Sequence, residues 1–221
     1  MSKENRKWVL QKRRDHYYNL AKKDNYRSRS TYKLLQLNKK FRLIREGDTV
    51  IDLGCAPGGW LQATREIVGK EGMVIGVDLQ EVEPFSDKNI FLIKGDIIKE
   101  ETLTKVKDIL FKKASVVISD IAPNISGIWS IDHAKSISLA TTALIIATKM
   151  LKKGGNFTTK VFQGILFDEY VKITSEYFDK IFIEKPDPCR TKSAEVYLVA
   201  KNFNQKEFSI DPNSPIAQLL R

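Results

Sequence analysis

The feature that most constrains the fold is an alternation of short apolar runs with amphipathic segments, which begins near residue 49. The apolar runs predict strands at 49–53, 73–78, 90–94, 116–120, 156–161, 180–183 and 195–200. The segments between them predict helices at 59–68, 101–110, 133–151 and 167–178. Strands that alternate with helices are typical of an α/β fold with a mainly parallel sheet and helices on both faces.

The last two predicted strands differ from the others in their connection. Residues 184–194 are too few for a crossover helix, and Pro186 and Pro188 oppose helix formation there. We therefore expect these two strands to pair as an antiparallel hairpin. The fold class that follows is α/β, with a seven-stranded, mostly parallel sheet and one antiparallel strand.

The charge of the chain is concentrated at its N-terminus. Residues 1–42 contain 14 Lys and Arg side chains and three acidic ones, a net charge of +11, whereas the whole chain carries +10. A local basic segment attracts polyanions, so nucleic acid is the expected partner, although a solvated helix would look the same. The segment has helical periodicity with a break near Asp24, and Ser28 or Ser30 could cap its second helix.

Three parts are expected along the chain. Residues 1–42 form a basic, helical extension that would bind nucleic acid, residues 43–201 form the α/β domain, and residues 202–221 form a polar C-terminal tail with a weak terminal helix. No apolar run is long enough for a membrane span, and the N-terminus lacks the apolar stretch of a secretory signal. We therefore expect a cytoplasmic monomer without a membrane partner.

The cysteines and histidines do not predict a metal site. Cys55 and Cys189 are the only cysteines, and neither has metal-ligand spacing to the other or to His16 and His133. We expect reduced thiols and no metal.

Residues 50–60 (VIDLGCAPGGW) predict a strand, a glycine-rich turn and the start of a helix. In open α/β sheets, ligands bind outside the carboxyl ends of the strands. Gly54, Gly58 and Gly59 permit a positive φ and a close approach of the backbone to a ligand. Trp60 follows them as either a cofactor contact or a core aromatic. The turn is therefore a candidate nucleoside site.

Asp78 ends the next predicted strand, and Asp96 lies just after the one that follows. Asp78 is placed to accept hydrogen bonds from ribose hydroxyls, and Asp96 is placed to meet an adenine edge, although either could merely cap a helix. A nicotinamide dinucleotide is the main competing ligand. The residues after Gly54 do not have the dinucleotide spacing, and Pro57 lacks the N–H that would bind a pyrophosphate. The pattern favours a sulfonium nucleoside.

Five stretches together resemble one known family, the FtsJ/RlmE-type ribose 2′-O-methyltransferases. They are residues 26–34 (YRSRSTYKL), 52–60 (DLGCAPGGW), 119–127 (SDIAPNISG), 160–164 (KVFQG) and 193–197 (SAEVY). The resemblance implies a Rossmann-like fold and S-adenosyl-L-methionine as cofactor. It also implies a catalytic tetrad of Lys33, Asp120, Lys160 and Glu195. The cofactor contacts that it implies are Gly58, Trp60, Asp78, Asp96 and Asp120.

The chemistry of the implied tetrad is consistent with the strand pattern. Asp120 and Lys160 end predicted strands and Glu195 begins the last one, so all three can face one cleft. We assign proton handling to Lys160, substrate positioning to Lys33 and Glu195, and the link toward the sulfonium to Asp120. Lys33 would disfavour the charged form of Lys160, whereas the two acids would favour it.

The predicted reaction is 2′-O-methylation of a ribose in RNA, with a uridine of large-subunit (23S-type) ribosomal RNA as the expected target. Transfer RNA is the alternative substrate, and a messenger cap is a more distant one. A base amino-methyltransferase is disfavoured, because residues 120–124 (DIAPN) lack the double proline and aromatic of such enzymes. A non-catalytic RNA-binding protein on a methyltransferase fold is the other alternative.

Overall fold

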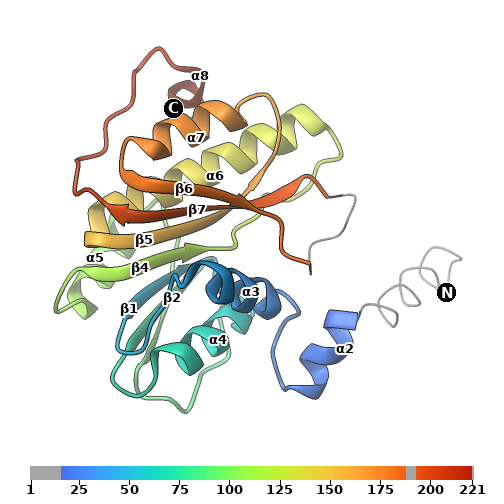
Figure 1. Cartoon of the computed structure of the whole chain (residues 1–221), viewed down its shortest axis with the longest axis vertical. Helices are drawn as coiled ribbons and strands as arrows, with labels where there is room; N and C mark the ends of the chain where they lie inside the picture. The colour runs from blue at the N-terminus through green and yellow to red at the C-terminus, as the bar shows by residue number, and fades with distance from the viewer. Residues whose placement is uncertain (1–15, 188–192, 221) are drawn as a thin grey trace, which may run out of the picture.

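The computed structural model describes residues 16–187 and 193–220. The predicted helical residues 6–15 and Cys189 lie outside the described residues. The described chain forms one sheet with helices on both faces (Figure 1).

The sheet has seven strands in the order β3-β2-β1-β4-β5-β7-β6, which confirms the predicted fold class. The strands are β1 (Thr49–Leu53), β2 (Met73–Asp78), β3 (Ile90–Lys94), β4 (Ala114–Ser119), β5 (Leu151–Phe162), β6 (Phe178–Glu184) and β7 (Glu195–Phe203). The predicted hairpin of the last two strands is confirmed. However, β7 inserts between β5 and β6 and runs antiparallel to both, so β6 is the edge strand. The start of β7 consequently lies beside the end of β5.

Each face of the sheet is covered by its own helices. The helices that the structure describes are α2 (His16–Lys23), α3 (Thr31–Phe41), α4 (Gly59–Val68), α5 (Glu100–Ile109), α6 (Trp129–Met150), α7 (Phe167–Ser175) and α8 (Pro215–Gln218). One apolar core joins α5, α6 and α7 to the sheet, and the second joins α3 and α4 to the other face. None of the helices in the described ranges is long and apolar enough to cross a membrane.

Helix α6 begins one turn earlier than the sequence pattern predicts. Its apolar periodicity starts at His133, but the helix starts at Trp129. The reason is the side chain of Asp132, which accepts hydrogen bonds from the backbone N–H groups of Ser126 (2.7 Å) and Gly127 (3.1 Å). These contacts fix the preceding loop against the first turn of the helix.

The start of α3 is also held differently from the prediction. Ser30 stands at the N-cap position, but its side chain makes no capping hydrogen bond. Instead, the Ser28 and Ser30 hydroxyls bond to each other at 2.8 Å, and the Thr31 hydroxyl donates to the Ser28 carbonyl oxygen at 2.8 Å. The start of α3 is thereby fixed without a serine cap.

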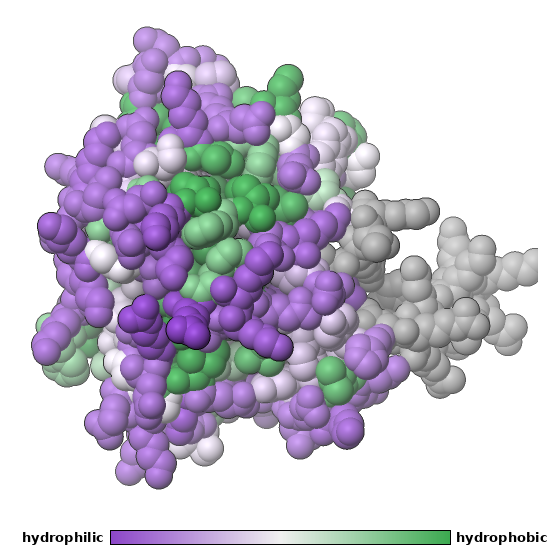
Figure 2. Space-filling view, in the orientation of Figure 1, coloured by the Kyte–Doolittle hydropathy of each residue, from purple (hydrophilic) through white to green (hydrophobic). Residues whose placement is uncertain are grey.

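The C-terminal residues return to the body of the fold. Ile216 in α8 is fully buried, and the Phe208 ring stacks on Tyr177 at a centroid distance of 5.4 Å. Ser214 caps α8 by accepting a hydrogen bond from the Ala217 N–H at 3.1 Å. On the face shown in Figure 2, the surface is mostly polar around a central apolar patch.

Candidate active site

The four residues of the predicted tetrad come together at the carboxyl edge of the sheet. Asp120 directly follows β4, and Lys160 lies near the end of β5. The antiparallel β7 begins at this edge, so that Glu195 pairs with Phe162, two residues beyond Lys160. Lys33 lies on α3, which packs with α4 on one face of the sheet. The insertion of β7 thus completes the cluster.

Two ion pairs organise the cluster. The Lys160 Nζ donates to the Asp120 Oδ1 at 2.8 Å and also to the Asp120 backbone carbonyl oxygen. The Lys33 Nζ donates to the Glu195 Oε1. Both lysines are 7% exposed. Buried ammonium groups are costly unless paired, so these contacts fix both lysines in place.

Tyr197 links the two pairs, and the sequence analysis assigned it no role. Its hydroxyl donates to the Asp120 Oδ1 at 2.6 Å, and the Lys33 Nζ lies 5.5 Å from its ring centroid. The available signal was its position on β7 two residues after Glu195, which places both side chains on one face of the strand. Burial favours the protonated form of Asp120, but the charges of Lys160 and Lys33 outweigh this, and the pKa of Asp120 is lowered.

Asp120 also opens onto a second feature, a cleft of about 560 Å³ across the ends of β1, β2, β3 and β4. The size is within the usual range for a small-molecule site. The cleft is lined by Gly54, Ala56, Val77, Asp78, Leu79, Gln80, Gly95, Asp96, Ile97, Ile98, Asp120, Ile121, Ala122, Pro123, Asn124 and Leu139. Both predicted acids are therefore in the lining.

Asp78 and Asp96 also accept hydrogen bonds from nearby backbone N–H groups, as the alternative role of a capping residue would require. Asp78 accepts hydrogen bonds from the backbone N–H groups of Ala56 (2.9 Å) and Gln80 (2.7 Å). Asp96 accepts one from Ile98 at 3.0 Å. A carboxylate can accept about four hydrogen bonds, so both retain capacity toward the cleft. The apolar lining after each acid, such as Leu79 and Ile98, was missed in the sequence.

The glycines of the turn have different structural roles. Gly54 has φ +75° and lines the cleft, and a Cβ there would lie 2.2 Å from a side-chain carbon of Ile121. Gly58 and Gly59 are absent from the cleft lining. A Cβ at Gly58 would meet the Arg27 side chain at 2.9 Å, and one at Gly59 would meet the Ser28 hydroxyl at 2.2 Å. The latter two glycines admit the segment that leads into α3.

Trp60 also attaches this segment. It is 3% exposed, and its indole N–H donates to the Ser30 carbonyl oxygen at 2.8 Å. Its ring centroid lies 5.8 Å from that of Tyr197. The side chain thus packs in the core below the tetrad and does not line the cleft.

Arg27 uses its positive charge within the fold. Its guanidinium donates to the carbonyl oxygens of Glu83 (2.7 Å) and Pro84 (3.1 Å) and lies 3.8 Å from the Phe85 ring centroid. The basic segment therefore both attaches to the sheet and leaves other basic groups, such as Lys22 and Lys23, exposed.

Several carboxyl groups lie near the turn. Asp52 on β1 is fully buried, and neither of its carboxylate oxygens has a hydrogen-bond partner in the described structure. Burial, with the nearby charges of Asp120 and Asp78, raises the pKa of Asp52 well above its usual range. A cluster of carboxyl groups beside a nucleoside-sized cleft suits a cationic ligand. The residues therefore fit a sulfonium nucleoside.

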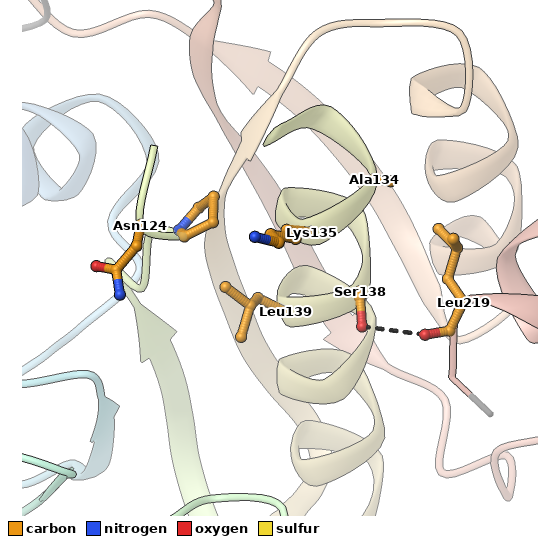
Figure 3. A pocket seen from close by; sticks show the side chains of 7 residues that line it. Asn124, Ala134, Lys135, Ser138, Leu139 and Leu219 are labelled. Atoms are coloured by element: carbon orange, nitrogen blue, oxygen red, sulfur yellow. Dashed lines mark hydrogen bonds between the residues drawn. The ribbon is translucent and has the colours of Figure 1, made fainter. Parts of the chain in front are cut away.

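A neighbouring hollow of about 410 Å³ adjoins this cleft, with Pro123, Asn124 and Leu139 in both linings. Its other lining residues are Ala134, Lys135, Ser138 and Leu219 (Figure 3). The Ser138 hydroxyl donates to the Leu219 carbonyl oxygen at 3.4 Å, so the C-terminal segment closes one side. No group of three potential metal-ligating side chains occurs in the described residues.

Comparisons with known proteins agree on one family. The family model described as FtsJ-like methyltransferase matches residues 26–203. Ribosomal RNA large subunit methyltransferase E of Methanococcus maripaludis strain C7 is 60% identical over 220 residues, covering 100% of this chain and 85% of the relative. The Methanocaldococcus jannaschii protein of that name is 55% identical over 211 residues, covering 94% and 86%.

Solved structures resemble the chain as well. One assigned as a ribosomal RNA methyltransferase from Plasmodium falciparum has a TM-score of 0.73 and 30% identity, covering 80% of this chain and 98% of that one. Aeropyrum pernix fibrillarin with natively bound S-adenosyl-L-methionine has a TM-score of 0.54 at 17% identity, covering 77% and 76%. The fibrillarin likeness concerns the fold alone.

Proposed function

The chain belongs to the FtsJ-like methyltransferase family and uses S-adenosylmethionine, and from this premise we propose that it methylates the ribose 2′-hydroxyl of a uridine in large-subunit ribosomal RNA. The relatives' names support the class of RNA. The observation that carries the reaction is the pairing of Lys160 with Asp120, because Asp120 also lines the cofactor cleft. A hydroxyl held by Lys160 would lie next to the cofactor.

The proposed cofactor contacts are the backbone at Gly54 and the side chains of Asp78, Asp96 and Asp120, which line the cleft. Gly58, Gly59 and Trp60 would act indirectly, by holding the segment before α3 against the turn. S-Adenosylmethionine supplies an electrophilic methyl group on a positively charged sulfur. Asp78 would accept from ribose hydroxyls and Asp96 would meet the adenine edge, since both open onto the cleft. Asp120 would stabilise the positive charge from the other side.

Lys160 would handle the proton of the acceptor. In the transfer, the bond between the cofactor sulfur and the methyl carbon would be exchanged for one to the ribose oxygen, with S-adenosylhomocysteine as the leaving group. The hydroxyl proton would leave at the same time, and a neutral Lys160 amine would take it. The lysine must therefore first release its own proton to water. Its contacts with Asp120 fix the nitrogen position, and such alignment accounts for much of the rate in a displacement reaction.

Lys33 and Glu195 would position the substrate. Their ion pair lies beside Tyr197, which touches Asp120, so the pair is connected to the reacting lysine through the side chains of Tyr197 and Asp120. Residues 1–42 would dock RNA phosphates, supported by their net charge of +11. Residues 43–201 would carry the chemistry.

The test is methyl transfer from labelled S-adenosylmethionine. The purified full chain is incubated with large ribosomal subunits, free ribosomal RNA or transfer RNA, and the methylated nucleotide is mapped by mass spectrometry. We expect a ribose methyl on a uridine of large-subunit RNA. A methyl on a base nitrogen, or preferential modification of transfer RNA, would contradict the proposal.

A further inference from the structure

Large apolar side chains are exposed on two segments next to the tetrad, namely the loop after β4 with the first turn of α6, and the loop after β5. We call them the edge patch: Ile125, Ile128, Trp129, Ile131 and Ile165, which are 41–92% exposed. The first four follow Asp120 and the last follows Lys160 along the chain. The two segments touch, because Gly164 lies against the ring of His133 in α6 and the Leu166 N–H donates to the His133 Nε2 at 3.1 Å. Clustered exposed apolar groups of this kind mark binding sites.

Trp129 is the aromatic member of the edge patch, and its ring lies close to the tetrad. It stacks on Phe162 at a centroid distance of 6.2 Å and an interplanar angle of 16°. Phe162 is two residues beyond Lys160 and pairs with Glu195 across the strands. Trp129 nevertheless remains 50% exposed, whereas Trp60 is 3% exposed and is used within the fold. The exposed indole is therefore available beside the substrate side of the tetrad.

The loop before Trp129 and the first turn of α6 are held together by hydrogen bonds within the chain. Asp132 accepts three hydrogen bonds from Ser126 and Gly127, and the His133 ring stacks on Trp129 at 5.9 Å. The hydrogen bonds from Ser126, ahead of other causes, lower the pKa of Asp132, so the anchor stays ionised. A preformed aromatic surface loses little conformational entropy on binding.

We propose that Trp129 is a stacking platform for an unpaired nucleobase of the RNA, within one nucleotide of the methylated ribose. The inference rests on the proposed function, because it takes an RNA ribose as the substrate. A ribose whose nucleotide is splayed out of a helix exposes a flat base that needs an apolar partner, and proteins usually supply an aromatic ring. The edge patch offers one at the tetrad, and the basic segment supplies the phosphate contacts.

The test measures RNA binding without turnover. Fluorescence anisotropy is recorded for the full chain with a labelled uridine dodecamer and with a ribose-phosphate dodecamer that lacks bases. We expect Trp129→Ala to weaken binding of the uridine dodecamer about tenfold, the usual size of effect when one base loses its aromatic partner, and to leave the abasic one unchanged. Trp129→Phe should retain most of the affinity.

The matched control is Phe111→Ala. Phe111 is 90% exposed but precedes β4, at the opposite edge of the sheet, so neither dodecamer should be affected. Thermal unfolding checks that each variant folds. Equal loss with both dodecamers would mean that Trp129 only supports its loop, and unchanged binding with both would leave the edge patch to a protein partner. Either result overturns the inference.

The two proposals fail separately. If the wild type methylates no ribose but its dodecamer binding still depends on Trp129 and on the bases, the proposed function fails and the platform remains. If ribose methylation is found while Trp129→Ala binds and turns over like the wild type, only the platform is overturned.

Discussion

The cofactor cleft and the tetrad lie side by side but are assembled differently. The cleft lies across the ends of β1, β2, β3 and β4, and each of its acids ends its own strand or lies within two residues after it. The tetrad joins residues from α3, β5, β7 and the loop after β4. The Lys33–Glu195 pair spans 162 positions, whereas Asp78 and the Ala56 N–H that it binds are 22 apart.

The comparison shows which of the two regions depends on the position of β7 in the sheet. Any parallel sheet in this strand order would collect Asp78, Asp96 and Asp120 at one edge. The tetrad requires in addition that β7 lie antiparallel beside β5. Glu195 at the start of β7 then lies next to the end of β5, which carries Lys160. We therefore expect changes at Lys33, Lys160 or Glu195 to affect turnover and changes at Asp78 or Asp96 to affect cofactor affinity, with each leaving the other nearly intact, whereas Asp120 belongs to both regions.

The largest effect is expected for Lys160→Ala, which tests the separation from the tetrad side. Removal of a positioned proton acceptor typically lowers the rate by ~10²–10⁴-fold. Cofactor affinity should change little, because Lys160 is absent from the cleft lining. Lys160→Arg should not restore turnover, since a guanidinium stays charged and has a different donor geometry. The measurement is single-turnover methylation at saturating RNA and cofactor, with calorimetry of S-adenosylhomocysteine in parallel.

The control for this prediction is Lys153→Ala, on an exposed position near the start of the same strand. Its rate should match that of the wild type. A Lys160→Ala protein with a near wild-type rate would remove Lys160 from the mechanism, and a parallel loss of cofactor binding would show that the two regions are not separable.

A smaller effect is expected from removing residues 1–15, which contain six Lys and Arg side chains and two acidic ones. The truncation leaves the sheet, the tetrad and the cleft in place. RNA affinity should fall, and its dependence on salt should flatten by up to about 0.9 in log–log slope for each phosphate that is no longer neutralised. Titrations at several salt concentrations measure the slope. An unchanged slope would mean that these charges do not touch RNA.

The cleft side is tested by Asp78→Ala. The substitution removes a proposed cofactor contact and the acceptor of the Ala56 N–H, so affinity for S-adenosylhomocysteine should fall by about tenfold, the effect of one or two hydrogen bonds to a charged group. The rate at saturating cofactor should change less. Calorimetry gives the affinity, with Asp87→Ala, a partly exposed acid outside the cleft, as the control. Undiminished affinity would argue against Asp78 as a ribose acceptor.

The sequence predicts features that depend on local pattern better than features that depend on distant residues. The bounds of β1, β2, β3 and α4 were predicted correctly, because each begins and ends where apolar periodicity meets a turn residue. The early start of α6 was missed, since it depends on side-chain contacts of Asp132 rather than on periodicity. The tetrad was named only through a family resemblance, because no local pattern states that Lys33 meets Glu195.

Individual side chains are the hardest to predict. The sequence leaves Trp60 as either a cofactor contact or a core aromatic, and its indole packs in the core. Gly59 stands in the same turn as Gly54 but serves the approach of Ser28. Tyr197 has no role that its local sequence indicates. Such details depend on which neighbour arrives from far along the chain, and local periodicity carries no information about that.

The smallest effect is expected from Asp52→Asn, which tests the role of the buried carboxyl group near the cleft. Asp52 has a raised pKa in the folded chain, so between its ordinary value of ~3.9 and that raised value the folded state keeps a proton that the unfolded state releases. Its contribution to stability is therefore complete at acid pH and is lost as the pH rises through this window. The amide does not ionise, so the variant should lose less stability than the wild type between pH 4 and neutrality. Each kcal/mol of that difference should appear as about 2–4 °C in unfolding temperature.

The same substitution should weaken the cofactor by a few-fold, because a carboxyl group near the turn can respond to a cationic ligand and an amide cannot. Unfolding temperatures of wild type and Asp52→Asn from pH 4 to 8, with and without S-adenosylmethionine, measure both effects. Parallel pH profiles would show that Asp52 does not hold the extra proton. Equal stabilisation by the cofactor in both proteins would limit the electrostatic role to Asp78 and Asp120, and the cleft would then recognise its ligand through the strand ends alone.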